Sequence, residues 1–88
     1  MNWFIYIVRC NDKSFYTGIT NNLERRMNQH NTSKSLGSRY ARTRRPVKLV
    51  FSELTTSRSK ALKREAEIKK LSRKEKFDLI SYAENIRN

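Results

Sequence analysis

Three segments of the chain carry apolar residues in the pattern of short β-strands. Residues 3–10, WFIYIVRC, are rich in β-branched and aromatic side chains and form a short run. The polar cluster NDKS follows, and SFYTGI at 14–19 then predicts the returning strand of a hairpin. VKLVFSEL at 47–54 alternates apolar and polar positions, which predicts a third strand.

A helix is predicted directly after the hairpin. Asn21 and Glu24 have the spacing of a capping box, so the helix is expected to begin at Asn21. Leu23 and Met27 give it an apolar face, and it is expected to end near Asn31. Residues 31–46, NTSKSLGSRYARTRRP, are polar, basic and aperiodic. This segment is expected to be a long mobile loop that contacts a ligand or stays disordered alone.

The last third of the chain predicts two further helices. Apolar residues recur with helical spacing from about Ser57 to Leu71, and Ser72 with Glu75 forms a capping box that opens a final helix. The expected order is therefore β-β-α-β-α-α within one domain spanning residues 1–88. This order predicts an α+β fold, in which a small three-stranded, mostly antiparallel sheet is flanked by three helices.

The length of the hairpin loop decides which side chains share a face of the sheet. A two- or four-residue loop would put Tyr6 and Tyr16 on opposite faces. The three-residue loop NDK instead sets Tyr6 opposite Gly18 and Val8 opposite Tyr16, so that both phenols share a face and Gly18 leaves space over the Tyr6 ring. This register needs a left-handed backbone near Lys13. Strand tyrosines more often serve packing than chemistry, so both interpretations stay open here.

The composition adds a strong positive charge to this fold. The 88 residues hold 20 Lys and Arg against 8 Asp and Glu, a formal net charge of +12. No acidic residue occurs between Glu24 and Glu53, which concentrates positive potential in the middle third. A polyanion is the expected partner. Nucleic acid is favoured over a membrane, because no predicted helix has a wide bulky apolar face, and over a merely solubilising surface.

Targeting signals and cysteine usage add little to this interpretation. No run approaches the roughly 20 apolar residues that cross a bilayer, and the first residues lack the features of a secretory signal. We therefore expect a cytoplasmic protein. Its one cysteine, Cys10, cannot close an intrachain disulfide and is expected to be a small hydrophobic residue at a strand end.

The helix after the hairpin places an arginine on its inner face. Leu23, Arg26, Met27 and His30 are spaced i, i+3, i+4 and i+7, so they lie along one stripe, and Arg25 does not. An inward guanidinium can clasp a phosphate through two parallel hydrogen bonds, or it can cover apolar surface or pair with an acid. His30 has a simple alternative too, since a histidine at a helix end interacts favourably with the helix dipole.

The helix predicted at 57–71 holds two glutamates in different settings. Glu67 lies near lysines on the outer face and is expected to form solvated ion pairs. Glu65 lies within the apolar stripe, where a lone charge would be costly. Its partner is expected to be either Arg26, in a structural ion pair, or a divalent cation of the Mg²⁺ or Mn²⁺ type.

Four segments in order resemble the GIY-YIG nuclease superfamily: FIY at 4–6, YTG at 16–18, LERRMNQH at 23–30 and ALKRE at 61–65. The likeness spans nearly the whole chain and is to the small stand-alone bacterial members. By this resemblance Tyr6 and Tyr16 correspond to the two motif tyrosines and Arg26 to the catalytic arginine. His30 corresponds to the histidine one turn later, and Glu65 to the metal-binding glutamate.

The resemblance implies a divalent-metal-dependent endonuclease that hydrolyses phosphodiester bonds. Glu65 would hold one Mg²⁺ or Mn²⁺ ion that stabilises the leaving 3′ oxygen, and Arg26 with Tyr16 would bind phosphate oxygens. Tyr6 would deprotonate or orient the water. Because a phenol with a pKa near 10 is a poor base at neutral pH, His30 is the candidate second proton acceptor.

The sequence also departs from the family pattern. Ile19 stands where excision-repair members carry a lysine, and the asparagine that follows the glutamate in several nucleases has no match, since Asn85 and Asn88 are too remote. These departures keep a second hypothesis open. The chain could be a non-catalytic nucleic-acid-binding adaptor on the same fold.

The basic middle segment is the expected nucleic-acid contact. The residues assigned to it are Arg25, Arg39, Tyr40, Arg42, Arg44 and Arg45, with Tyr40 stacking on an unpaired base. Since 88 residues leave no room for a separate DNA-reading domain, we expect recognition by shape, with DNA favoured over RNA. A role in repair or recombination, with a protein partner that supplies targeting, would fit this selectivity.

Overall fold

The structure is a computed structural model that describes residues 2–87, so Asn88 lies outside the described residues. Its elements in chain order are β1 (Trp3–Arg9), β2 (Phe15–Thr20), α1 (Leu23–Thr32), α2 (Arg39–Arg42), β3 (Lys48–Thr55), α3 (Arg58–Lys69) and α4 (Arg73–Arg87). The expected α+β order is confirmed, with the short helix α2 added to it.

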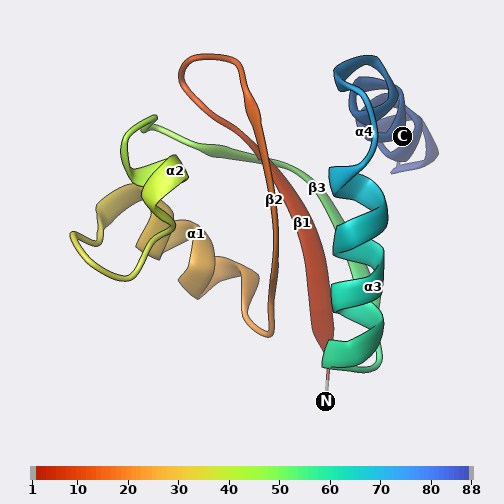
Figure 1. Cartoon of the computed structure of the whole chain (residues 1–88), viewed down its shortest axis with the longest axis horizontal. Helices are drawn as coiled ribbons and strands as arrows, with labels where there is room; N and C mark the ends of the chain where they lie inside the picture. The colour runs from red at the N-terminus through yellow and green to blue at the C-terminus, as the bar shows by residue number, and fades with distance from the viewer. Residues whose placement is uncertain (1, 88) are drawn as a thin grey trace.

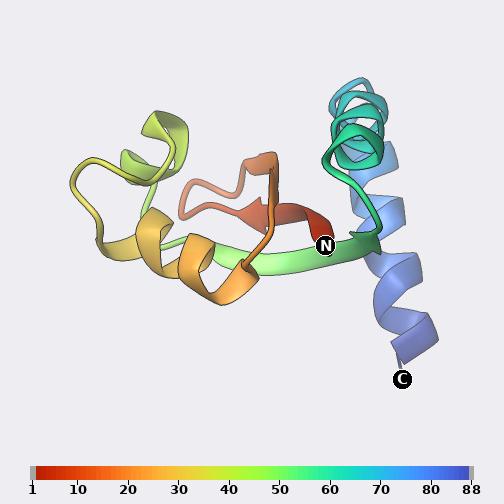
Figure 2. The same cartoon turned by 90° about the horizontal axis from the view of Figure 1, so that it is seen from below.

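The three strands form one antiparallel sheet in the order β2-β1-β3, with β1 in the centre. Helices α1 and α2 lie on one side of this sheet, and α3 and α4 lie on the other (Figures 1 and 2). Among residues 2–87, no helix is both long and apolar enough to cross a membrane.

The register of the hairpin matches the three-residue loop. Tyr6 pairs with Gly18 and Val8 pairs with Tyr16. Lys13 adopts the left-handed conformation, with φ of 70°, that this loop requires. Asp12 supports the turn, because its Oδ1 accepts a hydrogen bond from the Ser14 backbone N–H at 3.0 Å. The loop therefore places both tyrosines on the side of the sheet that α1 and α2 cover.

Alternate residues of β1 supply two separate cores. The core on the α3 and α4 side contains Ile5, Ile7, Phe51, Ala61, Ile68 and Ile80. The core on the α1 and α2 side contains Tyr6, Val8, Cys10, Ala41 and Val47, with Tyr16, Leu23, Met27 and Tyr40 packed against it. The strand period of two thus assigns neighbouring residues to different layers. Cys10 is buried among apolar residues, as expected.

The pairing of β1 with β3 contains one irregularity. Ile7 pairs with Phe51, whereas Val8 pairs with Leu49, so Val50 is an extra residue in β3. Such a β-bulge bends its strand and increases the local twist. The helical boundaries after β3 follow the sequence pattern, and the capping box of α4 is formed by reciprocal bonds between Ser72 and Glu75.

The predicted start of α1 is wrong by one residue. The N-cap is Asn22, whose side chain accepts from the Arg25 backbone N–H at 3.0 Å, so Asn21 and Glu24 form no capping box. Thr20 favours Asn22 as the N-cap, because the Thr20 hydroxyl accepts from the Asn22 N–H at 3.1 Å and so fixes the turn before the helix. Asn21 instead accepts from the Arg25 guanidinium.

The prediction of an aperiodic loop at 31–46 is wrong for residues 31–32, which end α1, and for residues 39–42, which form α2. The mobility of the segment and its contact with a ligand stay predictions. Ser38 caps the four-residue helix α2 by accepting from the Ala41 N–H at 3.0 Å, and Ala41 is fully buried. Asn31 bonds both the N–H and the carbonyl of Val47, which ties the two ends of the segment together. The segment is therefore folded onto α1 by contacts between residues distant in sequence.

Candidate active site

Tyr6 belongs to the core on the α1 and α2 side of the sheet, and its side chain is fully buried. Its hydroxyl oxygen lies 2.8 Å from His30 Nε2 and accepts a hydrogen bond from Arg26 Nε at 3.4 Å. Burial raises the pKa of Tyr6 to about 12, a shift that the neighbouring Arg26 charge and hydrogen bond oppose and that the charge of Glu65 increases. The free protein therefore holds Tyr6 as a neutral phenol at pH 7.

His30 and Arg26 are the two side chains that hydrogen-bond to the Tyr6 hydroxyl among the described residues. His30 is fully buried, and its Nδ1 accepts a hydrogen bond from the Ser38 backbone N–H at 3.2 Å. Burial, together with the charges of Arg26 and Arg45, lowers the pKa of His30 to about 4. The imidazole is thus neutral at pH 7 and carries its proton on Nε2, from which it donates to Tyr6.

Gly18 provides the space that the Tyr6 side chain occupies. A Cβ atom on Gly18 would lie 2.6 Å from Tyr6 Cζ and closer still to the hydroxyl. No real Cβ contact is this short, so any side chain at position 18 displaces the phenol. The sequence prediction for this glycine agrees with the structure.

Tyr16 belongs to an array of rings beside the phenol. Its ring centroid lies 6.5 Å from that of Tyr6, and 5.7 Å from that of His30 in an edge-on contact. Tyr40 stacks on Tyr16 with centroids 5.8 Å apart, and the Arg44 guanidinium covers Tyr40 at 3.7 Å from its centroid. Tyr40 therefore lies between the Tyr16 ring and the Arg44 guanidinium, and its stacking on a base stays a prediction.

Arg26 points into the site and Arg25 points away from it, as their helical positions predict. Arg25 is exposed and donates to Asn21. Arg26 is half-buried, and besides its bond to Tyr6 it donates through Nη1. The acceptors of Nη1 are Gln29 Oε1 at 3.1 Å and the Leu36 carbonyl at 2.7 Å. Arg26 forms no ion pair with a carboxylate among residues 2–87.

Glu65 comes from α3, on the opposite side of the sheet from α1, and is close enough for its charge to act on the Tyr6 phenol. Its side chain is 18% exposed, against 67% for Glu67, and its ionic partner within the described chain is Lys69 at 3.5 Å. The alternative of a structural ion pair between Glu65 and Arg26 is thus not what the structure contains.

The donor set around Glu65 fits a hard divalent cation held by few protein ligands. No group of three or more His, Cys, Asp or Glu side chains gathers anywhere in residues 2–87, so a dedicated all-protein cage is absent from that range. Mg²⁺ and Mn²⁺ are commonly held by one or two carboxylates, with water and substrate phosphate as the other ligands. The half-buried Glu65 carboxylate, paired with the exposed Lys69, is a donor of this kind.

Several cations of the basic segment are used inside the chain. Arg45 donates to the carbonyls of Gln29, His30 and Ser33, and Arg42 donates to the Lys34 carbonyl. Arg44 pairs with Asp12 at 2.9 Å. These contacts use part of the hydrogen-bonding capacity of the three arginines, while Arg42 Nε is buried without a partner among the described residues. Contact of these arginines with a nucleic acid stays a prediction. Arg39 and Lys34 are exposed.

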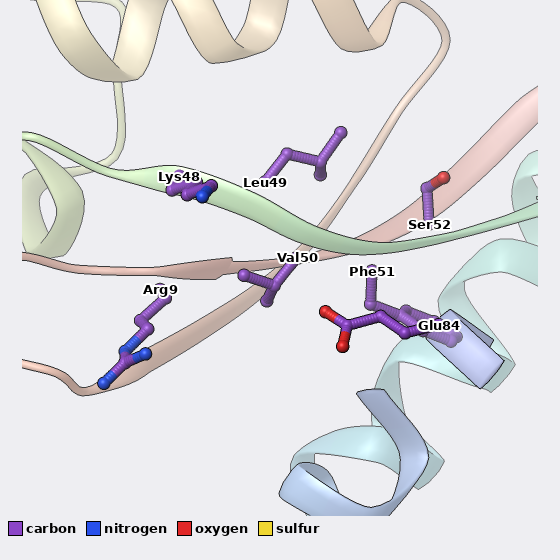
Figure 3. Close-up of a pocket in the computed structure, with 7 residues that line it drawn as sticks. All are labelled: Arg9, Lys48, Leu49, Val50, Phe51, Ser52 and Glu84. Atoms are coloured by element: carbon purple, nitrogen blue, oxygen red, sulfur yellow. The ribbon is translucent and has the colours of Figure 1, made fainter. Parts of the chain in front are cut away.

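A surface hollow of about 350 Å³ lies beside Arg26. It is lined by Trp3, Ile19, Thr20, Asn21, Arg25, Arg26 and Gln29, so it crosses the end of β2 between the two sides of the sheet. A different cavity, of about 310 Å³, is lined by Arg9, Lys48, Leu49, Val50, Phe51, Ser52 and Glu84 (Figure 3). None of the candidate catalytic side chains lines that second cavity.

The sequence interpretation missed the backbone groups that complete the site. The Leu36 carbonyl binds Arg26, the Ser38 N–H binds His30, and Gly37 lies between them against α1. One local signal was available, since a serine followed by RYAR has the N-cap pattern of a short helix. Its partners on α1 could not be found from local spacing.

Comparisons with known proteins agree with this geometry. Residues 2–78 match the sequence profile described as the GIY-YIG catalytic domain. A UPF0213 protein of Syntrophus aciditrophicus is 53% identical over 77 residues, covering 88% of this chain and 87% of its own. A UPF0213 protein of Desulfotalea psychrophila is 51% identical over 82 residues, covering 93% and 74%.

Two solved structures share the fold. The solution structure of a UPF0213 protein from Bacillus halodurans has a TM-score of 0.60 at 39% identity, covering 93% of this chain and 85% of that one. The solution structure of a protein from E. faecalis has a TM-score of 0.62 at 37% identity, covering 99% and 88%. With the four motifs on one fold and the profile match over most of its length, the chain belongs to the GIY-YIG family, among its small UPF0213 members.

Proposed function

We propose that this protein is a divalent-metal-dependent endonuclease that hydrolyses phosphodiester bonds in DNA. One observation carries the proposal: the Tyr6 hydroxyl lies between two hydrogen-bond donors, His30 Nε2 at 2.8 Å and Arg26 Nε at 3.4 Å. A phenol that serves only packing needs one partner. Two donors on one oxygen stabilise the phenolate, which is the form of Tyr6 that can take a proton from water.

In this proposal Tyr6 first gives its own proton to solvent, and the resulting phenolate then orients the attacking water and takes its proton. The pKa near 12 of the free protein shows that burial alone would oppose the first of these proton transfers, and the bonds from Arg26 and His30 reduce the opposition. The role of His30 differs from the one expected from sequence. Its Nδ1 is already an acceptor for Ser38, so His30 donates to Tyr6 and does not take a proton from it.

The substrate phosphate would be bound by donors that have no partner within residues 2–87. Arg26 Nη2 and the Tyr16 hydroxyl form no hydrogen bond in this part of the chain, whereas Arg26 Nε and Nη1 are engaged. Glu65 would hold the divalent ion, which supplies positive charge at the leaving 3′ oxygen when bound. The hollow beside Arg26 would receive the phosphate.

Exposed cations around the site would bind the nucleic-acid backbone. Arg25 lines the hollow, and Lys34 and Arg39 are exposed on the neighbouring segment. Contacts of lysine and arginine with phosphates position a nucleic acid without reading its sequence. Selection of DNA by its structure, as in a branched or nicked intermediate of repair or recombination, is part of the proposal.

The test incubates the purified protein with Mg²⁺ or Mn²⁺ and a panel of linear, single-stranded, flapped, nicked and branched DNAs, with RNA versions of each. Glu65→Gln is compared with Glu67→Gln, which changes an exposed carboxylate of the same helix. We expect cleavage by the wild type and by Glu67→Gln, and binding without cleavage by Glu65→Gln. If all three proteins bind and none cuts, the nuclease proposal fails.

The same panel decides the alternative of a non-catalytic adaptor. The observation that favours it is the raised pKa of Tyr6, which leaves the free protein without a phenolate at pH 7. An adaptor would bind one of these structures with a strong salt dependence and leave it intact with either metal.

A further inference from the structure

Figure 1 shows the loop that connects α1 to α2, and the backbone of this loop contacts two side chains of the site. The Leu36 carbonyl accepts from Arg26 Nη1 at 2.7 Å, and two residues later the Ser38 N–H donates to His30 Nδ1 at 3.2 Å. Arg26 and His30, which both donate to the Tyr6 hydroxyl, are therefore each hydrogen-bonded to the backbone of one short segment.

The residue between these two contacts permits the close approach. A Cβ atom on Gly37 would lie 2.6 Å from the Gln29 carbonyl oxygen and 2.9 Å from His30 Cα. These are atoms of the α1 backbone, which cannot move as the end of a side chain can. Gly37 has a negative φ, so this glycine is needed for space and not for an unusual conformation.

The loop is itself fixed from several directions. Ser33 Oγ accepts from the backbone N–H groups of Ser35 at 3.2 Å and Leu36 at 2.9 Å. Arg45 donates to the Ser33 carbonyl, and Ser38 caps α2. These contacts fix the positions of the two backbone groups that bind the site, the Leu36 carbonyl that accepts from Arg26 and the Ser38 N–H that donates to His30.

The backbone donor at Ser38 decides which ring nitrogen of His30 carries the proton. An N–H can only donate, so the Nδ1 atom that receives it must have a free lone pair. The neutral ring then holds its proton on Nε2, which faces Tyr6 at 2.8 Å. The phenol oxygen accepts hydrogen bonds from both Arg26 and His30. The hydroxyl hydrogen of Tyr6 must therefore point away from both of these donors.

We propose that the segment Leu36–Ser38 is the positioning element of the site: its backbone fixes Arg26 and the Nε2–H tautomer of His30, so that both donate to Tyr6. The three residues do not touch the reacting atoms. The catalytic meaning of this arrangement rests on the proposed nuclease function, whereas the tautomer itself does not.

The test compares Ser38→Pro with Ser38→Ala. Ser38 has φ of −63°, which proline adopts without strain, so Ser38→Pro removes the N–H that His30 needs. Both variants lose the hydroxyl that caps α2, and Ser38→Ala keeps the N–H. The nitrogen chemical shifts of His30 in labelled protein at pH 7 separate protonated from unprotonated ring nitrogens. Cleavage of the best DNA of the panel is measured beside them.

We expect the Nε2–H tautomer in the wild type and in Ser38→Ala, and a mixture of tautomers in Ser38→Pro. Turnover of Ser38→Pro is expected to fall about 10–100-fold below that of Ser38→Ala, the range found for groups that orient active-site ligands. Gly37→Ala is the second variant, used if Ser38→Pro does not fold by circular dichroism. It is expected to give the same mixture and the same loss.

The outcomes separate this inference from the nuclease proposal. A proton on Nδ1 in the wild type, or an unchanged tautomer in both Ser38→Pro and Gly37→Ala, overturns the positioning role whether or not DNA is cut. The Nε2–H tautomer in the wild type and its loss in Ser38→Pro, with no cleavage by any protein, supports the positioning role and removes the nuclease proposal.

Discussion

The two faces of the sheet are supplied by alternate residues of the same central strand, but they bury different chemistry. Ile5 and Ile7 face α3 and α4 in a core of aliphatic and aromatic carbon. Tyr6 and Val8 face α1 and α2, where a buried phenol and a buried imidazole lie 2.8 Å apart. Adjacent residues of β1 therefore divide into one layer that stabilises the fold and one that holds polar groups at a cost in desolvation.

The two faces differ in what fixes the positions of their side chains. On the apolar face, packing alone fixes the side chains, and volume is the property that matters. On the site face, each polar atom needs a partner in a defined direction, and the partners come from α1 and from the loop before α2. Substitutions on the two faces should thus affect different measured quantities.

The largest effect is expected for Tyr6→Phe. Loss of the hydroxyl should reduce turnover by roughly 10²–10⁴-fold, the contribution of a positioned acid or base. The free energy of unfolding should fall by only about 1–3 kcal/mol, because Arg26 and His30 lose an acceptor while the ring stays. Turnover is measured on the best DNA of the panel, with Tyr82→Phe, at an exposed tyrosine, as control. Wild-type turnover by Tyr6→Phe would contradict a chemical role for the phenol.

The neighbouring change, Ile7→Ala, should have the opposite profile. Ile7 is fully buried, so the lost methyl and methylene groups and the cavity should cost about 2–5 kcal/mol of unfolding free energy, measured by urea denaturation. Turnover per folded molecule at low temperature should stay close to that of the wild type. A large loss of turnover with unchanged stability would show that the two faces are not separable.

A smaller effect is expected from pH, and it belongs to the site face alone. The folded-state pKa of His30 is about 4, below the 6.5 of the unfolded chain, so between these values the unfolded state binds the extra proton. The stability that neutral His30 contributes is complete above pH 6.5 and is lost as the pH falls toward 4, at up to about 1.4 kcal/mol per pH unit. Urea denaturation of the wild type and His30→Gln should give curves that converge across this window. Parallel curves would mean that His30 is not held neutral.

The smallest effects are expected at two buried threonines of β2. Thr17 lies opposite Ile7, and its hydroxyl is buried without a partner within the described residues, so Thr17→Val should stabilise the protein by about 1 kcal/mol. Thr20 lies opposite Phe4 and bonds Asn22 at the start of α1, so Thr20→Val should destabilise by about the same amount. Thermal denaturation measures the change in stability of both variants. A change of the same sign in both would contradict the distinction between the two faces.

Local sequence signals predicted the hairpin and the inner face of α1 well. The loop NDK determined the pairing of Tyr6 with Gly18, because a three-residue loop with one left-handed residue allows one register. The inward direction of Arg26 followed from helical spacing. In each case the deciding information lies within one turn or one helix.

The parts that could not be predicted depend on contacts between distant residues. The charge of Arg45 is visible in the sequence, but the sequence does not show that this side chain donates to carbonyls of residues 12 to 16 positions earlier. Helix α2 has only four residues and so no apolar period to detect. Backbone groups such as the Ser38 N–H carry no signal of the side chain they bind, which is why the role of His30 changed once its partners were known.

The extra residue in β3 has a consequence for how this protein behaves at high concentration. β3 is an edge strand, and Leu49 and Leu54 are exposed on it, which is a pattern that invites another molecule to add a strand and start aggregation. The bulge at Val50 interrupts the flat row of backbone groups, and Lys48 places a charge at the beginning of the strand. An irregular, charged edge of this kind disfavours the addition of a further strand. The two site tyrosines, Tyr6 and Tyr16, lie on β1 and β2 and so are not part of this edge.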